Sequence, residues 1–243
     1  ESIRAGLVFQ LKEAVGPAVI EARESDFVRR AITSWSTNAN INVLGSHEAD
    51  RLSIVSFVIR YDDKFLHHNF VVALLNDVFG IQSRGGCSCA GPYGHRSHEF
   101  QREINRGCEG IKPGWVRVNF NYFIDDATFD YIVDAVHLIA SHGASLLSAY
   151  DFEPDSGLWH HRLGTGGPSM SLDEISYDSG EMTFENRRHS EAIDLARHLA
   201  AAHELLHSAC VEVASTCSHP ETNDDFEHLR WFPYPDEVGS PAD

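Results

Sequence analysis

Residues 52–59 run Leu-Ser-Ile-Val-Ser-Phe-Val-Ile, and this stretch decides the fold class. It is short, nearly continuous in apolar residues and rich in β-branched and aromatic side chains. Such a run is typical of a strand that is buried on both faces of a sheet. The sequence therefore predicts a core strand here, with a sheet at the centre of the fold.

Other strands and several helices surround this stretch. Residues 41–45 predict a second strand, and residues 116–122 alternate apolar and polar side chains as a half-buried strand does. Helical spacing follows in four places: residues 3–15 up to a break at Gly16-Pro17, residues 20–32, residues 68–79 closed by Gly80, and a stretch capped by Asp125 or Asp126. Strands and helices alternate through residue 142, which predicts an α/β fold.

Charge is distributed unevenly along the chain. The 243 residues hold 36 acidic and 19 basic side chains, a net charge of -17. Residues 1–150 hold 17 acids and 14 bases, whereas residues 151–243 hold 19 acids and 5 bases. We therefore predict a boundary near residue 150, followed by an acidic extension with a long helix at about 187–214.

Composition also narrows the partners and the compartment. The acidic excess repels nucleic-acid backbones and anionic membranes, so neither is expected as a partner. No apolar run reaches the length of a membrane span. Five cysteines are too few for a disulfide scaffold, and the cytoplasm is the expected location. The chain begins with Glu1 and enters a helical pattern at once, as expected for part of a longer protein.

A glycine-rich loop at residues 84–95 is the first candidate for chemistry. It runs Arg-Gly-Gly-Cys-Ser-Cys-Ala-Gly-Pro-Tyr-Gly-His. Glycines let the chain turn sharply after a strand and bring a thiol near a cleft. Cys89, or its neighbour Cys87, is then a candidate nucleophile, with Arg84 close by. The alternative is an ordinary turn with incidental cysteines.

Arg117 is the second candidate. It stands in a strand otherwise built from apolar residues such as Val116 and Val118. A buried guanidinium needs an anionic partner, and its planar fork suits a carboxylate. An internal ion pair or an outward-facing position is the alternative.

The segment His203-Glu204-Leu205-Leu206-His207 matches a zinc-hydrolase pattern. Two histidines four residues apart share a helix face and can bind zinc, while the glutamate activates water. A catalytic zinc needs a third protein ligand, which this segment does not supply. The alternative is the polar face of an amphipathic helix.

A second candidate metal site combines ligand types that suit zinc, although Cys-x-Cys is not the usual spacing of a structural zinc site. Its members are Cys87, Cys89, His95, His98 and Cys108.

Together the loop and the later strand resemble the C-terminal part of class V aminotransferase-fold enzymes, which depend on pyridoxal phosphate. The branch most similar contains cysteine desulfurases and selenocysteine lyases. That family carries Arg-x-Gly-x-x-Cys-Ala-x-Pro after a strand, and the matching positions are Arg84, Gly86, Cys89, Ala90 and Pro92. The resemblance covers about residues 1–142. It implies the small domain of a fold-type I enzyme, with a mixed or antiparallel sheet and packed helices.

The resemblance also implies roles for residues. Cys89 would be the nucleophile that accepts sulfur, and Arg117 would bind the carboxylate of a small amino acid such as cysteine or selenocysteine. Arg84 would add positive potential. The parent enzyme would be a homodimer.

The chain departs from this family in its lysines. A pyridoxal-phosphate enzyme holds its cofactor on a lysine. Only Lys12, Lys64 and Lys112 are present, and none matches the family's position. We therefore expect a C-terminal fragment that neither binds the cofactor covalently nor turns over alone. A zinc module using His203 and His207, or an acidic interaction domain without catalysis, is the alternative.

Overall fold

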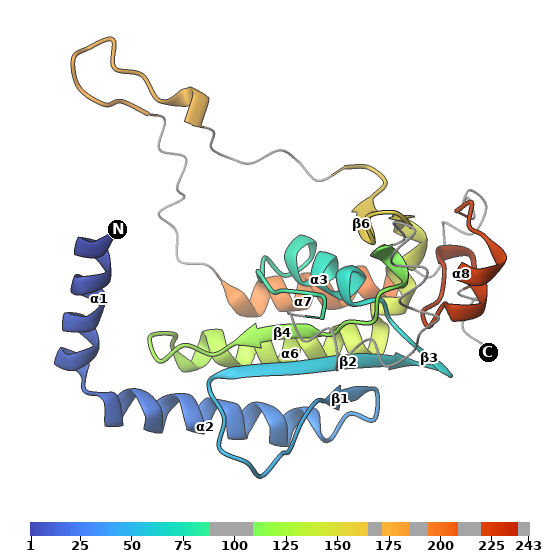
Figure 1. Ribbon diagram of the computed structural model, residues 1–243, viewed down its shortest axis with the longest axis horizontal. Coiled ribbons are helices and arrows are strands. Elements are labelled where there is room, and N and C mark those ends of the chain that lie inside the picture. The colour runs from blue at the N-terminus through green and yellow to red at the C-terminus, as the bar shows by residue number, and fades with distance from the viewer. Residues whose placement is uncertain (88–108, 165–171, 185–193, 209–219, 238–243) are drawn as a thin grey trace.

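The computed structural model describes residues 1–87, 109–164, 172–184, 194–208 and 220–237. Within these ranges the fold is mixed α/β, with small antiparallel sheets and helices packed beside them (Figure 1). This confirms the α/β class that the sequence predicts at the level of architecture.

The main sheet is built around one strand. β2 (Ile54–Tyr61) pairs in antiparallel fashion with β1 (Ile41–Val43), β3 (Lys64–Phe65) and β4 (Val116–Asn119). The register places Ser56 of β2 directly opposite Arg117 of β4.

The expectation that β2 is buried on both faces is wrong. Burial alternates along the strand: Val55, Phe57 and Ile59 are buried, whereas Ile54 is 42% exposed and Ser56 is half-buried. Among the described residues, helices cover only one face of the sheet, and a sequence cannot show which of two apolar faces is covered. In this part of the chain the other face, called the open face below, has no helix over β2 and β4.

Two helices form the covered side of the sheet. Trp35 at the end of α2 (Pro17–Trp35) is fully buried, and its ring centroid lies 5.2 Å from that of Phe57. Its indole Nε1 donates a hydrogen bond of 3.2 Å to the carbonyl of Val133 in α6 (Asp126–His142). Asp125 caps α6, since its carboxylate accepts from the backbone N–H of Thr128 at 2.8 Å. The predicted cap is confirmed.

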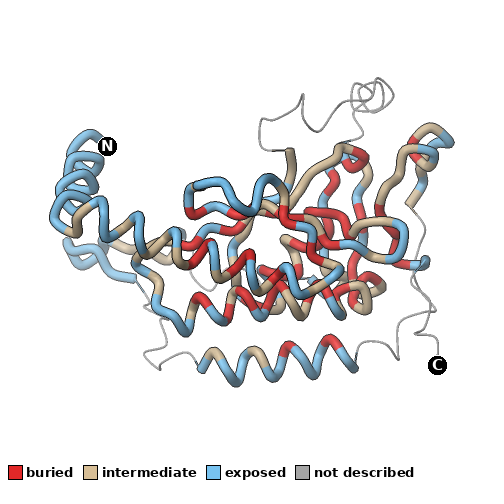
Figure 2. Tube along the Cα trace, turned by 90° about the horizontal axis from the view of Figure 1, so that it is seen from below, coloured by how far each residue is buried: buried red, intermediate tan, exposed pale blue. Residues whose placement is uncertain are grey.

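The first helix stands apart from the core. α1 (Ser2–Val15) ends at Gly16, whose φ of 94° only glycine adopts readily, and the chain turns there into α2. No residue of α1 is buried, and Figure 2 shows it exposed along its length. Ile3 is 83% and Leu7 is 60% exposed, so α1 presents an apolar surface to solvent.

The chain beyond residue 142 packs against the same core. A short 3-10 segment (Gly143–Ala149) leads into the hairpin of β5 (Tyr150–Glu153) and β6 (Leu158–His161), which lies on α3 (His68–Asp77). α7 (Leu195–Ser208) packs on α6, and a short helix, α8 (Asp224–Leu229), follows. Buried residues from this half belong to the hydrophobic cluster of the main sheet: Phe152, Trp159, Ala202, Leu206, Phe226, Phe232 and Tyr234.

The predicted long helix at about 187–214 is present as α7 over Leu195–Ser208. Asp194 precedes it without helical structure. The remaining residues of the predicted range, 187–193 and 209–214, lie outside the described residues.

One segment has the length and composition of a membrane span. It is Asp126–Ala149, which comprises α6 and the 3-10 segment after it. In the fold, Phe129, Val136 and Ile139 of this segment are buried in the core. In the fold, 44% of the apolar window in this segment is buried. The described residues contain no other candidate span.

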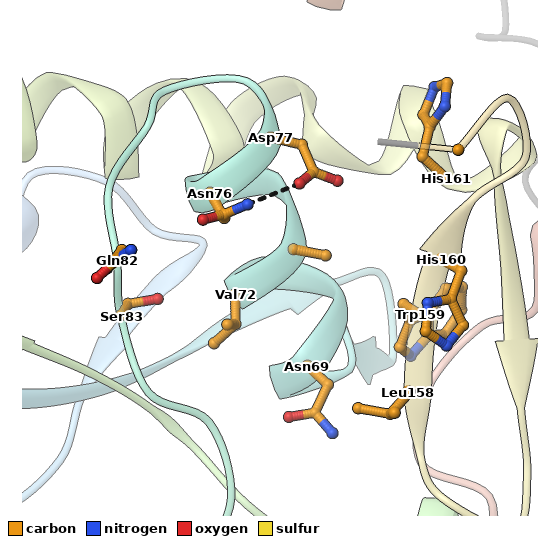
Figure 3. Close-up of a pocket in the computed structure, with 12 residues that line it drawn as sticks. Asn69, Val72, Asn76, Asp77, Gln82, Ser83, Leu158, Trp159, His160 and His161 are labelled. Carbon is orange, nitrogen blue, oxygen red and sulfur yellow. Dashed lines mark hydrogen bonds between the residues drawn. The ribbon is translucent and has the colours of Figure 1, made fainter. Parts of the chain in front are cut away.

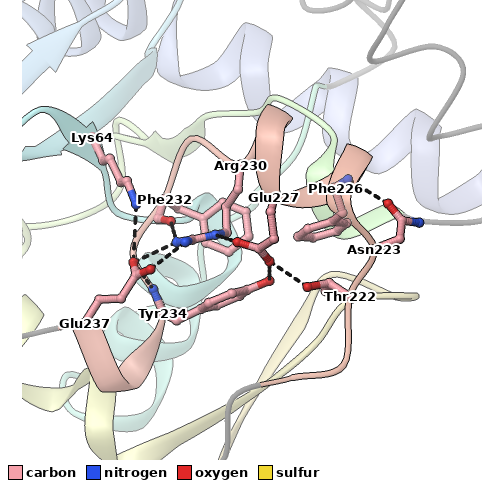
Figure 4. Close-up of polar contacts among 9 residues, drawn as sticks. All are labelled: Lys64, Thr222, Asn223, Phe226, Glu227, Arg230, Phe232, Tyr234 and Glu237. Carbon is pink, nitrogen blue, oxygen red and sulfur yellow. Dashed lines mark hydrogen bonds and ion pairs between the residues drawn. The ribbon is translucent and has the colours of Figure 1, made fainter.

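A polar cluster fixes residues 220–237 to the sheet (Figure 4). Arg230, whose side chain is 8% exposed, donates to Glu227 at 2.9 Å and to Glu237 at 2.7 Å. Glu237 also accepts a hydrogen bond of 3.3 Å from the ammonium of Lys64 in β3. The guanidinium of Arg230 lies 4.0 Å from the ring centroid of Tyr234. Although burial opposes ionisation, the hydrogen bonds from Arg230 lower the pKa of Glu237 to about 2.

Candidate functional site

Arg84 and Arg117 lie on neighbouring backbone segments. The N–H of Arg84 donates to the carbonyl of Arg117 at 3.2 Å, and the N–H of Arg117 donates to the carbonyl of Arg84 at 2.8 Å. Residues that exchange both hydrogen bonds in an antiparallel pair carry their side chains on the same face. The fold thus brings the two predicted binding residues together. Arg84 belongs to no strand, and this pair is an isolated bridge beside β4.

The two arginines belong to the open face of the sheet. In β4 the side chains of Val116 and Val118 are buried on the covered face, so Arg117 between them points to the other face, where it is half-buried. Arg84 is exposed. Because Ser56 lies opposite Arg117 on the other side of β4, the open face carries a row of Arg84, Arg117 and Ser56.

This row concentrates positive charge. Like charges placed directly opposite each other destabilise a sheet. Within the described ranges no carboxylate lies in ion-pair distance of Arg84 or Arg117. Two guanidinium forks side by side present several N–H donors to one anion. The arrangement is therefore suited to binding a small anionic group.

The glycine-rich loop begins at this pair. Gly86 adopts a φ of 106°, and its carbonyl accepts from the N–H of Trp115 at 3.3 Å. The thiol of Cys87 is free and half-buried. The predicted nucleophile Cys89 lies outside the described residues, as do the other members of the weaker zinc set, His95, His98 and Cys108.

Two buried histidines, His67 and His68, stand at the start of α3, and His68 lies close to this loop at Gly85. His67 caps α3: its Nδ1 accepts from the N–H of Asn69 at 3.2 Å, while its Nε2 lies 3.1 Å from the carbonyl of Gly110 and donates to it. Burial, and then the neighbouring His68, lower the pKa of His67 well below its usual range. Burial also lowers the pKa of His68. Both rings are therefore neutral near pH 7.

The His203–His207 segment is helical, as predicted, and the fold adds a third imidazole. The ring centroid of His207 lies 4.1 Å from that of His203 and 4.1 Å from that of His142 in α6. The Nδ1 of His207 lies 2.8 Å from the carbonyl of His203 and donates to it. Across the part of the chain that the structure describes, no group of three ligand-type side chains is arranged to hold a metal ion.

The three lysines lie away from the arginine pair or are engaged elsewhere. Lys12 is exposed on α1, Lys64 pairs with Glu237 at 3.3 Å, and Lys112 pairs with Glu109 at 3.2 Å.

A groove of about 690 Å³ is lined by α3, the Gln82–Ser83 segment and β6 (Figure 3). Figure 3 shows Asn69, Val72 and Asn76 of α3 between the Gln82–Ser83 segment and β6. Two buried polar atoms of lining residues, Ser83 Oγ and Trp159 Nε1, have no hydrogen-bond partner among the residues that the structure describes.

Sequence analysis missed Ser56, Asn69 and His142. Each gains its position from a contact between segments far apart in the chain. For Ser56 the sequence offers one signal, a serine inside an otherwise apolar strand. For Asn69 and His142 it offers no signal.

Searches against protein-family models and against curated proteins found no match for this chain.

Proposed function

We propose that this chain is the C-terminal part of a class V aminotransferase-type enzyme that depends on pyridoxal phosphate, and that Arg84 and Arg117 bind the carboxylate of a small amino-acid substrate. The antiparallel sheet with helices on one face would be the small domain of a fold-type I enzyme. The single observation that carries the proposal is the Arg84–Arg117 pair on the open face.

The chemistry of the pair favours a small carboxylate. A planar guanidinium binds a carboxylate through two parallel hydrogen bonds, which a point charge does not reproduce. The net charge of -17 repels extended polyanions, whereas a small zwitterion meets little repulsion. Ser56 and the half-buried Val58 beside the pair are small and uncharged, which suits a small substrate side chain.

The cofactor does not fit the residues of this chain. Lys64 and Lys112 are held in ion pairs with Glu237 and Glu109, and Lys12 is exposed on a helix without buried residues. The proposal therefore places pyridoxal phosphate on another part of the parent enzyme, and no step is derived through it. The exposed apolar residues of α1 support a further packing partner, because Ile3, Leu7 and Phe9 are each at least 60% exposed.

The thiols define the reaction class within this family. Cys87 lies three residues beyond Arg84 in the described loop, and Cys89 is the predicted nucleophile. Sulfur or selenium removal from the substrate is thus the proposed chemistry, in a cytoplasmic homodimer.

The first test uses this chain and a redox-inert amino acid. Titration with L-alanine, followed by ¹⁵N NMR of the arginine side chains, should shift the Nε–H signals of Arg84 and Arg117. Arg60 lies on the same strand face as Ser56 but further along β2, and its signal is the internal control. Saturating shifts confined to other residues would contradict the proposal.

A second test addresses the cofactor. The full-length gene product that contains this chain should absorb in the visible range, and borohydride should bleach the band and fix the cofactor to a lysine other than Lys12, Lys64 and Lys112. A colourless protein that retains stoichiometric zinc would favour the hydrolase alternative instead.

A further inference from the structure

Asn69, in the first turn of α3, has a carboxamide that is held at both ends. Its Oδ1 lies 2.9 Å from the Nδ1 of His68, and its Nδ2 donates to the carbonyl of Gly157 at 2.7 Å. Oδ1 accepts from His68 in the tautomer protonated at Nδ1, whereas in the other tautomer Nε2 donates to the carbonyl of Lys112 at 3.3 Å. The bond from Nδ2 to Gly157 holds the carboxamide in both cases. Figure 3 shows the side chain of Asn69 reaching from α3 toward β6. The carboxamide therefore cannot swing aside without losing a hydrogen bond.

Gly85 rests against this fixed carboxamide. A Cβ atom at position 85 would lie 2.6 Å from Asn69 Oδ1 and 3.1 Å from His68 Nδ1, and every near atom belongs to a side chain of α3. Gly85 does not adopt a positive φ, so its own backbone would admit alanine. Glycine is needed at this position because of how closely the loop approaches α3.

The loop is held from its other side by β4. Arg84 is bonded through its backbone to Arg117, and the carbonyl of Gly86 is bonded to Trp115. Gly85 lies between these two attachments. A displacement of Gly85 away from α3 would therefore move Arg84 and Gly86, the residues on either side of it.

We propose that Asn69 is a positioning residue for the candidate site: it sets how closely Gly85 approaches α3, and so where the side chain of Arg84 lies beside Arg117. This inference rests on the proposed function of that pair. Asn69 itself touches no substrate, and it acts through Gly85.

A double-mutant cycle tests the proposal. Gly85→Ala should weaken L-alanine binding about tenfold, the equivalent of about 1.4 kcal/mol, because the new methyl group pushes the loop off the carboxamide. In an Asn69→Ala background the same change should alter binding by less than about twofold, because the one contact shorter than 3.0 Å is gone and only those with His68 and Val72, at 3.1 and 3.2 Å, remain. Gly6→Ala is the control, since no atom lies within 4 Å of a Cβ at Gly6.

The measurement separates positioning from stability. Thermal unfolding is recorded for each variant, and affinity is measured well below the lowest midpoint. A loss of affinity on Gly85→Ala that is equal in both backgrounds, or no loss in either, would overturn the proposal. If Gly85→Ala does not fold, the Asn69→Ala variant alone tests the proposal. It should weaken L-alanine binding and shift the backbone amide signal of Arg84. If neither quantity changes, Asn69 is not a positioning residue.

Failure of the proposed function gives a different result. If the wild-type chain binds no amino acid, the arginine pair loses its assigned role. The double-mutant cycle is then measured through the backbone amide signal of Arg84 instead of through affinity. The shift of this signal on Gly85→Ala should still vanish in the Asn69→Ala background. Persistence of that shift would remove Asn69 as the positioning residue independently of any ligand.

Discussion

Arg84 and Arg117 exchange both backbone hydrogen bonds, at 3.2 and 2.8 Å, and so carry two cationic side chains on one face of the sheet. The α-carbons of such a pair lie about 5.5 Å apart. The loop that contains Arg84 and the strand that contains Arg117 are therefore one structural unit. A change that displaces the backbone of either segment should therefore displace the guanidinium groups of both arginines.

Replacing Arg117 tests the substrate role. Arg117→Ala should weaken L-alanine binding by about 1.5–3 kcal/mol, the usual contribution of hydrogen bonds to charged groups. Arg117→Lys should lose most of the same affinity, because an ammonium lacks the planar fork. The Michaelis constant of the proposed full-length enzyme should rise in parallel. An unchanged constant for Arg117→Lys would remove the assignment.

Replacing Arg84 should increase stability while it lowers affinity. The two arginines repel each other when no anion is bound, so Arg84→Thr should raise the free energy of unfolding by about 0.2–1 kcal/mol. Urea denaturation in low salt measures this difference. Arg60→Thr is the matched control, because Arg60 is also exposed on a strand but pairs with Phe65. Destabilisation by Arg84→Thr would mean that Arg84 has a structural partner.

The buried histidines predict a loss of stability on acidification. The native pKa of His67 lies well below 6.5, so only the unfolded chain takes up a proton just below that pH. The contribution of His67 to the free energy of unfolding should therefore be complete above about pH 6.5. Below that pH, the free energy of unfolding should fall by up to about 1.4 kcal/mol per pH unit.

A variant isolates this contribution. His67→Asn keeps a side-chain acceptor for the N–H of Asn69 but does not titrate. It should be less stable than the wild type at pH 8, because it loses ring packing on Trp231, yet its stability should depend less steeply on pH between 6.5 and 5. His160→Asn, at an exposed position in β6, should keep the wild-type slope.

The Arg230 cluster acts at lower pH. The pKa of Glu237 is lowered to about 2, so its contribution is present above about pH 4.5 and is lost as the pH falls toward 2. Glu237→Gln should cost about 1–2 kcal/mol near neutrality, after allowance for solvent screening, and almost nothing near pH 2. Urea denaturation at several pH values gives the comparison, with Glu13→Gln on the exposed α1 as control. A constant difference across this range would exclude ionisation as the cause.

Local signals in the sequence predicted the ends of elements well. Gly16 breaks α1 from α2, Asp125 caps α6, and Gly80 adopts a φ of 65° after α3. Each signal depends on the conformational preference of one residue or on a hydrogen bond within one turn. Such preferences can be seen in a sequence without knowing the rest of the fold.

Contacts between distant segments could not be predicted in the same way. The spacing of residues does not show that Arg84 pairs with Arg117, that Asn69 meets Gly85, or which face of β2 is covered. These depend on strand register and on the placement of α2 and α6. The resemblance named both arginines, whereas the fold supplies their pairing and the open face that they share.

Metal analysis separates the proposed function from its main alternative. After expression in zinc-supplemented medium, the chain should retain less than about a tenth of an equivalent of zinc, because a closed or catalytic zinc site needs at least three protein ligands. His203 and His207 supply two, and the nearby ring of His142 does not complete a metal site among the described residues. Stoichiometric zinc that disappears in both His203→Ala and His142→Ala would show that the three rings rearrange around a metal. The α6–α7 contact, and not the arginine pair, would then be the functional centre of the chain.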